Sequence, residues 1–499
     1  MVFSLLLPSL AEAASYILSG KVTDKDGEPV AFATIAVKKS HSGTQTDESG
    51  RYSITLKPGS YEVEASCIGY YPVTKKVSLT ADTGCDFTLA PNSIGLQEVR
   101  VMGKSAAKKL QEGALAVNAV EIRNQANRVT TLNDIVDRSS GVKVRREGGV
   151  GSDLDLSING LSGNSIRYFI DGVPLTTRGG DVNLDHIPLS TVDRVELYKG
   201  VVPSYLGADA LGGAVNIVSK RSRENFIDAS YGAASFHTQM ADLSAQWFIP
   251  KTAVAIRPQV GFTSSKNDYK MKNVEVWSEE ESKFVKATRR RFHDDYSSLY
   301  AQIEAGVNNV KWADAFFVSG SYTKIDKEIQ TGAMQTKVYG EARRKAHAWG
   351  IGMRYAKRFG NLATRLNVNH TWDHSTTIDT AFRKYNWDGS WIPASGNEMT
   401  NRSRMMRVYK RPFTSVNAGV SCDINPYHNI AFDYNLNRRG NDRSDKFDKT
   451  FEPSSDNISK HILALTYTQS LFSSKWQNTF FVKDYINHTH VGQSDWPSI

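Results

Sequence analysis

Cysteine is scarce in this sequence. Cys67, Cys85 and Cys422 are the three cysteines among 499 residues, which is too few for a disulfide framework in a chain of this length. Cys67 and Cys85 could pair if neighbouring strands bring them together, or both could remain thiols. The sequence therefore excludes a small, disulfide-stapled secreted fold.

Long apolar runs are also lacking. A helix that crosses a bilayer needs about 20 consecutive apolar residues, whereas hydrophobic residues make up 40% of this chain and its mean hydropathy is −0.41. An inner-membrane helix bundle is thereby excluded. A membrane β-barrel is not, because its strands alternate apolar and polar residues and average out as hydrophilic.

Enzyme motifs are missing as well. The sequence has no His-Glu-x-x-His pair, no nucleophile elbow and no phosphate-binding loop, so we expect no enzymatic activity, no catalytic residue, no metal and no cofactor. The net charge of +9 is modest. It fits contact with anionic lipid or ligand, or a solvated basic surface, and we expect no nucleic-acid partner.

Residues 1–14 resemble an export signal. An apolar run from Val2 to Leu10 leads to Ala11-Glu12-Ala13, a small-x-small cleavage pattern. The run is short and lacks a positive start, which suggests a start codon further upstream; a frayed apolar terminus is the alternative. A signal peptide would place the protein beyond the inner membrane.

Short strands broken by turn residues fill residues 15–90. We expect strands at 17–22, 31–37, 51–56 and 61–65, separated by Asp/Gly and Pro-Gly turns. This spacing predicts a small β-sandwich. The segment GKVTDKDGEPVAFATIAV and the later TDESGRYSITLKPGSYEVEASCIGY resemble the carboxypeptidase-regulatory-like, transthyretin-like domain.

Residues 91–105 predict a linker with an extended centre, Gln97-Glu98-Val99-Arg100-Val101-Met102. An unpaired strand of this kind can add to the sheet edge of a partner, where backbone hydrogen bonds supply affinity. An ordinary linker is the alternative.

Residues 106–220 combine helix and strand patterns. Thr130 or Thr131 could cap a helix through Leu132, Ile135 and Val136 that ends near Gly141. Strands are expected at 142–144, 154–158, 166–171 and 192–198. The region therefore predicts an α+β domain.

Several motifs in fixed order make this domain specific. The segments SINGLSGNSIRYFIDGVPL and IPLSTVDRVELYKGVVPSYLGADALGGAVNIVSK resemble the plug of TonB-dependent outer-membrane receptors. Asn159-Gly160, Ser140-Gly141 and Tyr205-Leu206-Gly207 depart from the family pattern, which affects the subfamily. The matching residues are Asp171, Gly172, Val173, Pro174, Arg194, Glu196, Gly200, Gly212, Gly213 and Asn216.

This resemblance implies a mechanism. In the family the plug blocks the barrel lumen, and a TonB-type inner-membrane complex pairs with a segment before the plug and pulls on it. The matching segment here is 97–102, where Arg100 departs from the apolar pattern of the family. Arg194 and Glu196 lie two apart on one strand and share a face, so we expect them to meet charges of the barrel wall; a solvated ion pair is the alternative.

From residue 221 to 499 the hydrophobic period becomes two. Ile227, Ala229 and Tyr231 alternate with Asp228 and Ser230, and similar alternation recurs near 241–247, 254–262, 299–305, 349–355 and 430–436. Lipid outside and water inside would require this pattern. A soluble sandwich would show it too, so the lengths of the connections must decide.

Short and long connections alternate strictly. Short ones are expected at 250–251, 308–309, 359–360, 425–426 and 473–474, and long polar ones at about 265–294, 326–345, 376–410 and 442–458. Periplasmic turns and extracellular loops of outer-membrane barrels alternate in this way. The sequence thus predicts a mainly β protein with an incomplete antiparallel transmembrane barrel.

About eleven strands are expected, whereas the resembled family closes its barrel with about 22. An open edge would leave backbone groups unsatisfied in lipid, and the last residues, 493–499, fall in a loop. We therefore expect a truncated sequence whose barrel needs further strands.

The ligand is left open by the sequence. The resemblance favours a ferric siderophore or another iron complex, with a glycan importer of the SusC-like type, a cobalamin importer or a signal-transducing receptor as alternatives. The basic run Arg289-Arg290-Arg291, with 343–345, could attract an anionic chelate, contact lipopolysaccharide or simply be solvated.

Overall fold

The structure is a computed structural model. It describes residues 15–38, 42–67, 70–90, 110–111, 115–122, 131–207, 209–220, 225–278, 280–332, 337–472 and 476–493. The predicted signal peptide and the segment 97–102 lie outside these residues. The chain forms two compact units, 1–109 and 110–499, which are described separately.

The first unit is a β-sandwich, as predicted. Its core contains Leu18, Ile35, Leu79 and Phe87, all fully buried, and Cys67 and Cys85 pack against it as thiols. The expected strand at 31–37 is shorter than predicted. One sheet contains β1 (Tyr16–Asp24), β4 (Arg51–Leu56), β7 (Thr83–Gly84) and β8 (Phe87–Leu89), and the other β2 (Thr34–Val37), β3 (Gly43–Gln45), β5 (Gly59–Ser66) and β6 (Val73–Leu79).

The second unit begins with a mixed domain that has its own apolar core. Its main sheet has the order β13-β12-β15-β14-β9, with β12 and β15 parallel. The strands are β9 (Val117–Glu121), β12 (Ile166–Ile170), β13 (Val173–Pro174), β14 (Val192–Lys199) and β15 (Gly213–Ser219), and a separate hairpin pairs β10 (Val142–Arg146) with β11 (Leu154–Ile158).

One short helix, α2 (Leu132–Asp137), packs into this core. Thr131 caps it, because its side chain accepts from the backbone of Asp134 while the Asp134 carboxylate accepts from the backbone of Thr131. Leu132, Ile135 and Val136 are buried in the domain core. The predicted cap and apolar face are both confirmed.

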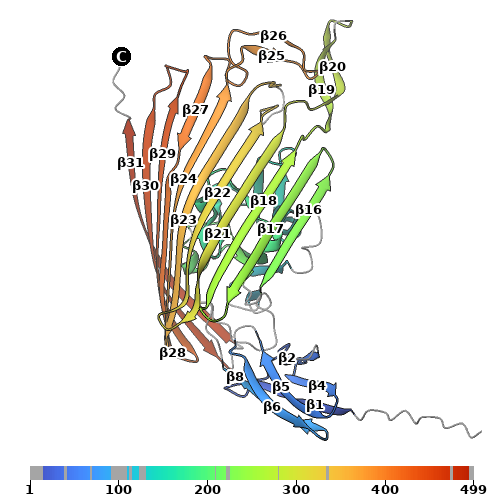
Figure 1. Cartoon of the computed structure of the whole chain (residues 1–499). Coiled ribbons are helices and arrows are strands. Elements are labelled where there is room, and N and C mark those ends of the chain that lie inside the picture. Colours follow the sequence, from blue (N-terminus) through green and yellow to red (C-terminus); the bar gives the residue numbers. More distant parts are fainter. Residues whose placement is uncertain are drawn as a thin grey trace, which may run out of the picture. The chain divides into compact units, whose positions relative to one another are not determined.

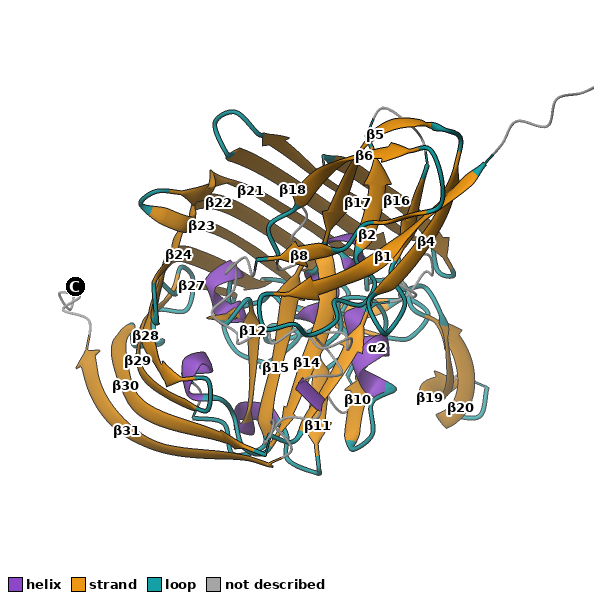
Figure 2. Ribbon diagram, turned by 90° about the horizontal axis from the view of Figure 1, so that it is seen from below, coloured by secondary structure: helices purple, strands orange, loops and turns teal. Residues whose placement is uncertain are grey.

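A large antiparallel sheet follows and curves around the mixed domain (Figures 1 and 2). Its twelve strands occupy eleven positions, because β27 and β28 lie end to end between β24 and β29. The strands are β16 (Phe226–Ala234), β17 (Thr238–Ile249), β18 (Val254–Ser265), β21 (Tyr296–Val310), β22 (Ala313–Glu328), β23 (Arg343–Phe359), β24 (Leu362–Asp379), β27 (Met405–Lys410), β28 (Phe413–Asn425), β29 (His428–Asp445), β30 (Ser454–Leu471) and β31 (Trp476–Gln493).

The faces of this sheet are reversed relative to a soluble protein. Along β23, Trp349 and Ile351 are each 57% exposed, while Ala348, the residue before Trp349 on the same strand, is 3% exposed. On the concave side, polar residues such as Thr371 and Asp433 are buried against the mixed domain. The apolar face therefore points outward and the polar face inward, as a lipid-facing barrel wall requires.

All the long connections lie at one end of the sheet, and the short turns lie at the other, apart from the β16–β17 turn at 235–237 (Figure 1). The turn predicted at 308–309 is misplaced, because β21 runs to Val310 and the chain turns at 311–312. The connection at 266–295 is not a simple polar link, since it holds a hairpin of β19 (Lys270–Ser278) and β20 (Lys283–Arg290). A second small hairpin pairs β25 (Arg383–Tyr385) with β26 (Trp391–Pro393).

Among the described strands, β16 and β31 form the two edges of the large sheet, and they pair only with β17 and β30. The wall is thus an open arc, which agrees with the expected incomplete barrel. In the part of the chain that the structure describes, no helix is both long and apolar enough to span a membrane.

Candidate functional site

Two signature motifs far apart in the sequence meet at Asn216. Asp171 and Gly172 form the turn between β12 and β13 with φ values of 50° and 79°, as two-residue hairpin turns require. The Gly172 amide donates to Asn216 Oδ1 at 3.0 Å, and the Ser219 amide donates to Asp171 Oδ1 at 3.0 Å. This turn, which continues into Val173-Pro174, is therefore fixed to β15.

The signature charges of β14 pair with each other. Arg194 donates to Glu196 Oε1 at 2.9 Å from Nε, with Nη2 2.7 Å away, and also contacts Asp193 at 3.2 Å. Glu196 is fully buried and Arg194 is 8% exposed. The alternative of a solvated pair is therefore wrong, while direct contact of these two residues with charges of the wall stays a prediction.

Glu196 accepts two further hydrogen bonds. Tyr198 Oη and Asn216 Nδ2 each donate to its Oε2 at 2.9 Å. Burial, reinforced by Tyr205 and Glu196, holds the pKa of the Tyr198 phenol well above its usual value, so Tyr198 stays protonated. One carboxylate thus joins strands β14 and β15, and through Asn216 it reaches the turn at Gly172.

Glycine is required at one motif position for steric reasons. Gly213 has a φ of 129°, and a Cβ there would lie 2.0 Å from the Tyr198 carbonyl oxygen. Gly200 has a φ of 91° but open space around it, and a Cβ at Gly212 would lie 3.0 Å from Leu161. Close pairing of β14 with the start of β15 therefore depends on Gly213 above all.

Two tyrosines connect the buried charges to the barrel wall. The hydroxyls of Tyr198 and Tyr205 are 2.8 Å apart, and the Arg365 guanidinium of β24 lies 5.1 Å from the Tyr205 ring centroid. Arg365 pairs with Asp433 of β29, which accepts from Ser204 Oγ at 2.6 Å. The signature residues therefore reach charged residues of the wall through Tyr198 and Tyr205.

Further contacts hold the mixed domain to the wall at the end with the long connections. Asn267 both accepts from and donates to the backbone of Val150, at 2.9 Å each. Arg344 of β23 makes a bidentate pair with Asp181, its shortest contact being 2.8 Å. Bidentate Arg–carboxylate pairs are geometrically specific, so these contacts fix the position of the mixed domain. This domain is the plug that the sequence predicts, and it is called the plug below.

Other contacts lie near the far edge of the sheet. Lys460 of β30 and Arg167 of the plug both bind Asp209, the latter at 3.0 Å. Burial raises the pKa of the Asp209 carboxyl, but hydrogen bonds from Lys460 and Arg167 outweigh this and leave the pKa lowered. Lys483 of β31 donates to the Val202 carbonyl at 2.8 Å. The plug is thus bonded to the wall from the connection after β18 to β31.

His186 provides a contact that can titrate. Its Nε2 lies 2.6 Å from the hydroxyl of Tyr296 on β21, and its Nδ1 lies 2.8 Å from Asn183 Oδ1. Burial lowers the pKa of His186 in spite of the nearby Asp185 and Asp181. The neutral imidazole is therefore the form that fits this position.

A cavity separates plug and wall beside a cluster of wall charges. Glu304 pairs with Arg257 at 2.9 Å and with Arg354 at 3.0 Å, and both guanidinium carbons lie over Phe317, at 4.6 and 4.8 Å. On the plug side the cavity is lined by Asp171 and by other residues that include Arg178 and Lys220. A polar space of this kind can hold water or a polar solute.

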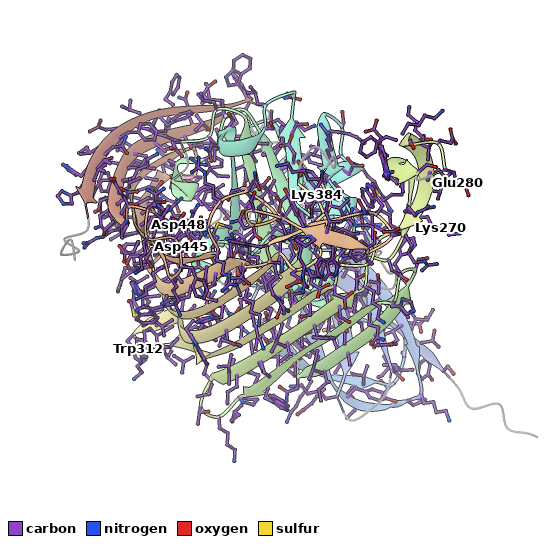
Figure 3. The ribbon with its side chains drawn as sticks, turned by 90° about the horizontal axis from the view of Figure 1, so that it is seen from above. Lys270, Glu280, Trp312, Lys384, Asp445 and Asp448 are labelled. Atoms are coloured by element: carbon purple, nitrogen blue, oxygen red, sulfur yellow. The ribbon has the colours of Figure 1, made fainter. Side chains whose placement is uncertain are left out.

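The sequence motifs located the plug core but not its partners in the wall. Asn267, Arg344 and Asp433 bind residues that lie 117 to 229 positions away. In the sequence, these wall residues could have been found only as polar residues at inward-facing positions of strands or at strand ends. In Figure 3, viewed onto the long connections, Asp445 marks the end of β29 and Asp448 the connection after it, and Lys270 and Glu280 lie on the β19–β20 hairpin.

A sheet that is apolar outside, polar inside and curved around a separately folded domain is the architecture of outer-membrane receptors with a plugged barrel. Comparison with known protein families agrees with this architecture. Residues 17–90 match the carboxypeptidase regulatory-like domain, and residues 108–214 match the TonB-dependent receptor plug domain.

Two known proteins are similar in sequence to part of this chain. A TonB-dependent receptor of Formosa agariphila is 29% identical over 215 residues, 42% of this chain and 20% of that protein. The vitamin B12 transporter BtuB of Vibrio vulnificus is 26% identical over 190 residues, 37% of this chain and 30% of that protein. These matches therefore span less than a third of either relative.

A solved structure shares the fold. A variant of the ferric enterobactin receptor PfeA from Pseudomonas aeruginosa superposes with a TM-score of 0.56 at 11% identity, over 78% of this chain and 60% of that one. Residues 108–214 thus match a TonB-dependent receptor plug domain, and the chain is similar to TonB-dependent receptors in sequence and to an outer-membrane receptor in fold.

Proposed function

We propose that this protein imports a scarce ligand across the outer membrane, driven by a TonB-type inner-membrane complex. The observation that carries the proposal is the plug itself, hydrogen-bonded along the polar inner wall by Asn267, Arg344 and Asp433. A barrel lumen blocked by a separately folded domain needs an input of work to open. The related receptor and the BtuB transporter support this function.

The ligand we propose is a ferric siderophore or another iron complex. Support comes from the shared fold with the ferric enterobactin receptor. A cobalamin is the second candidate, favoured by the sequence similarity to a vitamin B12 transporter. The domain boundaries we propose are a periplasmic β-sandwich at 15–90, a linker at 91–105, a plug at 106–220 and a barrel wall from 221.

Uptake by a deletion strain tests the importer proposal. Cells that lack the gene should lose uptake of one labelled compound when iron complexes, cobalamin and glycans are supplied singly, and a plasmid copy should restore it. Unchanged uptake of all of these compounds would refute the proposal. Loss of cobalamin or glycan uptake alone would refute the iron-complex ligand but keep the importer.

We further propose that segment 97–102 binds the energy-transducing partner as an added strand. Deleting these six residues in the full-length receptor should abolish uptake and leave ligand binding to whole cells intact. Deletion of 91–96 shortens the same linker equally and is the matched control, which should retain uptake. Equal loss in both variants would mean that linker length, rather than this segment, matters.

A further inference from the structure

Four basic side chains form a row on the outer face of the wall. Lys324, His347, His374 and Lys410 stand directly opposite one another on β22, β23, β24 and β27. Directly opposed side chains have Cβ atoms about 5 Å apart, and the two imidazole rings stack with centroids 5.3 Å apart and 7° between planes. We call these four residues the basic row.

The basic row faces outward. Successive side chains of a strand point to opposite faces. Thr323, Ala348 and Asp373 are buried on the inner side, while their neighbours on the outer face, such as Lys324 and His347, are exposed, as is Lys410. Thr323 next to the row donates to the carbonyl of Arg178 in the plug at 3.0 Å. The row therefore cannot contribute to a site in the lumen.

None of the four side chains of the row is engaged in an ion pair within the described part of the chain. Among the described residues, no carboxylate lies within ion-pair distance of any of its four members. Asp442 is in register with Lys410 but accepts from Ser455 Oγ at 2.6 Å, and Asp326 binds Arg343 at 3.0 Å and Lys345 at 3.8 Å. His374 Nδ1 is buried and has no hydrogen-bond partner in the described part of the chain.

An aromatic row lies beside it. Two residues along each strand toward the short turns, Tyr322, Trp349 and Trp372 stand opposite one another, and Tyr322 and Trp349 have ring centroids 4.4 Å apart. Trp349 is 57% and Trp372 44% exposed. Exposed Trp and Tyr on a membrane protein lie at head-group level, so the basic row lies at or beyond the head groups, on the side of the long connections.

We propose that the basic row binds a phosphate group on the head group of an anionic lipid in the outer leaflet. Ammonium groups complement a phosphate by charge and by hydrogen bonding, and imidazole N–H groups complement it by hydrogen bonding. The adjacent aromatic row offers an apolar surface to the acyl chains. The site is independent of the transported ligand, because it faces away from the lumen.

Lipid binding by the purified full-length receptor tests this site. The probe is lipid A in phosphatidylcholine nanodiscs, compared with the same lipid A after its phosphates are removed, and mass spectrometry measures the lipid retained on the protein. The double variant Lys324→Gln/Lys410→Gln should bind phosphorylated lipid A up to roughly thirty-fold more weakly, on the basis of the usual contribution of two lysines near a charged surface.

Matched variants make the result decisive. Lys345→Gln removes a lysine of the same face that is already paired with Asp326, and it should leave binding unchanged. Lys324→Arg/Lys410→Arg keeps the charge and should bind like the wild type, which also shows that the strands still fold. The proposal is overturned if the double glutamine variant binds normally, if the arginine variant loses binding, or if lipid A without phosphates binds equally well.

Discussion

Replacing Glu196 with alanine should open the plug sheet locally. The substitution leaves the Arg194 guanidinium, the Tyr198 hydroxyl and the Asn216 amide without the carboxylate that each contacts at 2.7 to 2.9 Å. Removing one partner of a buried ion pair costs about 3–5 kcal/mol. We therefore expect amide hydrogen exchange in β14 and β15 to become hundreds- to thousands-fold faster, while exchange in β22 and β23 of the wall changes little.

Two further variants separate charge from packing in this network. Glu196→Gln keeps the shape and one acceptor oxygen, so its cost should be smaller, about 1–3 kcal/mol. The double variant Arg194→Met/Glu196→Leu removes both charges, so its cost should be smaller than that of Glu196→Ala and should reflect only the hydrogen bonds that Tyr198 and Asn216 lose. Wild-type exchange rates in Glu196→Ala, or an equal loss in the double variant, would refute the role assigned to this pair.

Other contacts of the plug give further predictions. Because burial lowers the pKa of His186 below its ordinary 6.5, the neutral ring stabilises the docked plug fully above that pH and progressively less as the pH falls toward the folded-state pKa. Protease sensitivity of the plug should thus rise on acidification, and His186→Gln should flatten this response; an unchanged profile would contradict it. Gly207→Ala should loosen the plug by more than 1 kcal/mol, since Gly207 has a φ of 56° and its Cβ would lie 2.2 Å from Asn435. Gly200→Ala is the control, because Gly200 also has a positive φ but has open space around it. If both variants speed amide hydrogen exchange in residues 204–207 equally, the clash with Asn435 is not the cause.

Local chemistry made several elements predictable from the sequence. The capping box at Thr131, the Asp171-Gly172 turn and the period-two strands each depend on residues close together in the chain. The eleven positions of the wall follow from the alternation of short and long connections. Predictions of this kind succeed because the local backbone preference and the burial pattern agree.

Other features depend on contacts that no local pattern encodes. The hairpin β19–β20 carries many charges, which predicted a polar link, but Val274 and Val276 pack with Trp387 from another connection. The asparagines at 308–309 resemble a turn, and Asn309 does take a positive φ of 53°, although the strand continues past it. The pairing of Ser204 with Asp433 joins residues 229 apart.

The orientation of the wall is the central claim, and spin labels along β23 test it most directly. Single nitroxide labels at 348, 349, 350 and 351 of the full-length receptor in bilayers would report collisions with oxygen, which is enriched in lipid, and with a polar nickel complex. We predict high oxygen accessibility at Trp349 and Ile351 and low accessibility at Ala348 and Gly350, because the first two are 57% exposed and the others are buried. Shielded labels at Trp349 and Ile351, with water-accessible labels at Ala348 and Gly350, would contradict a lipid-facing wall.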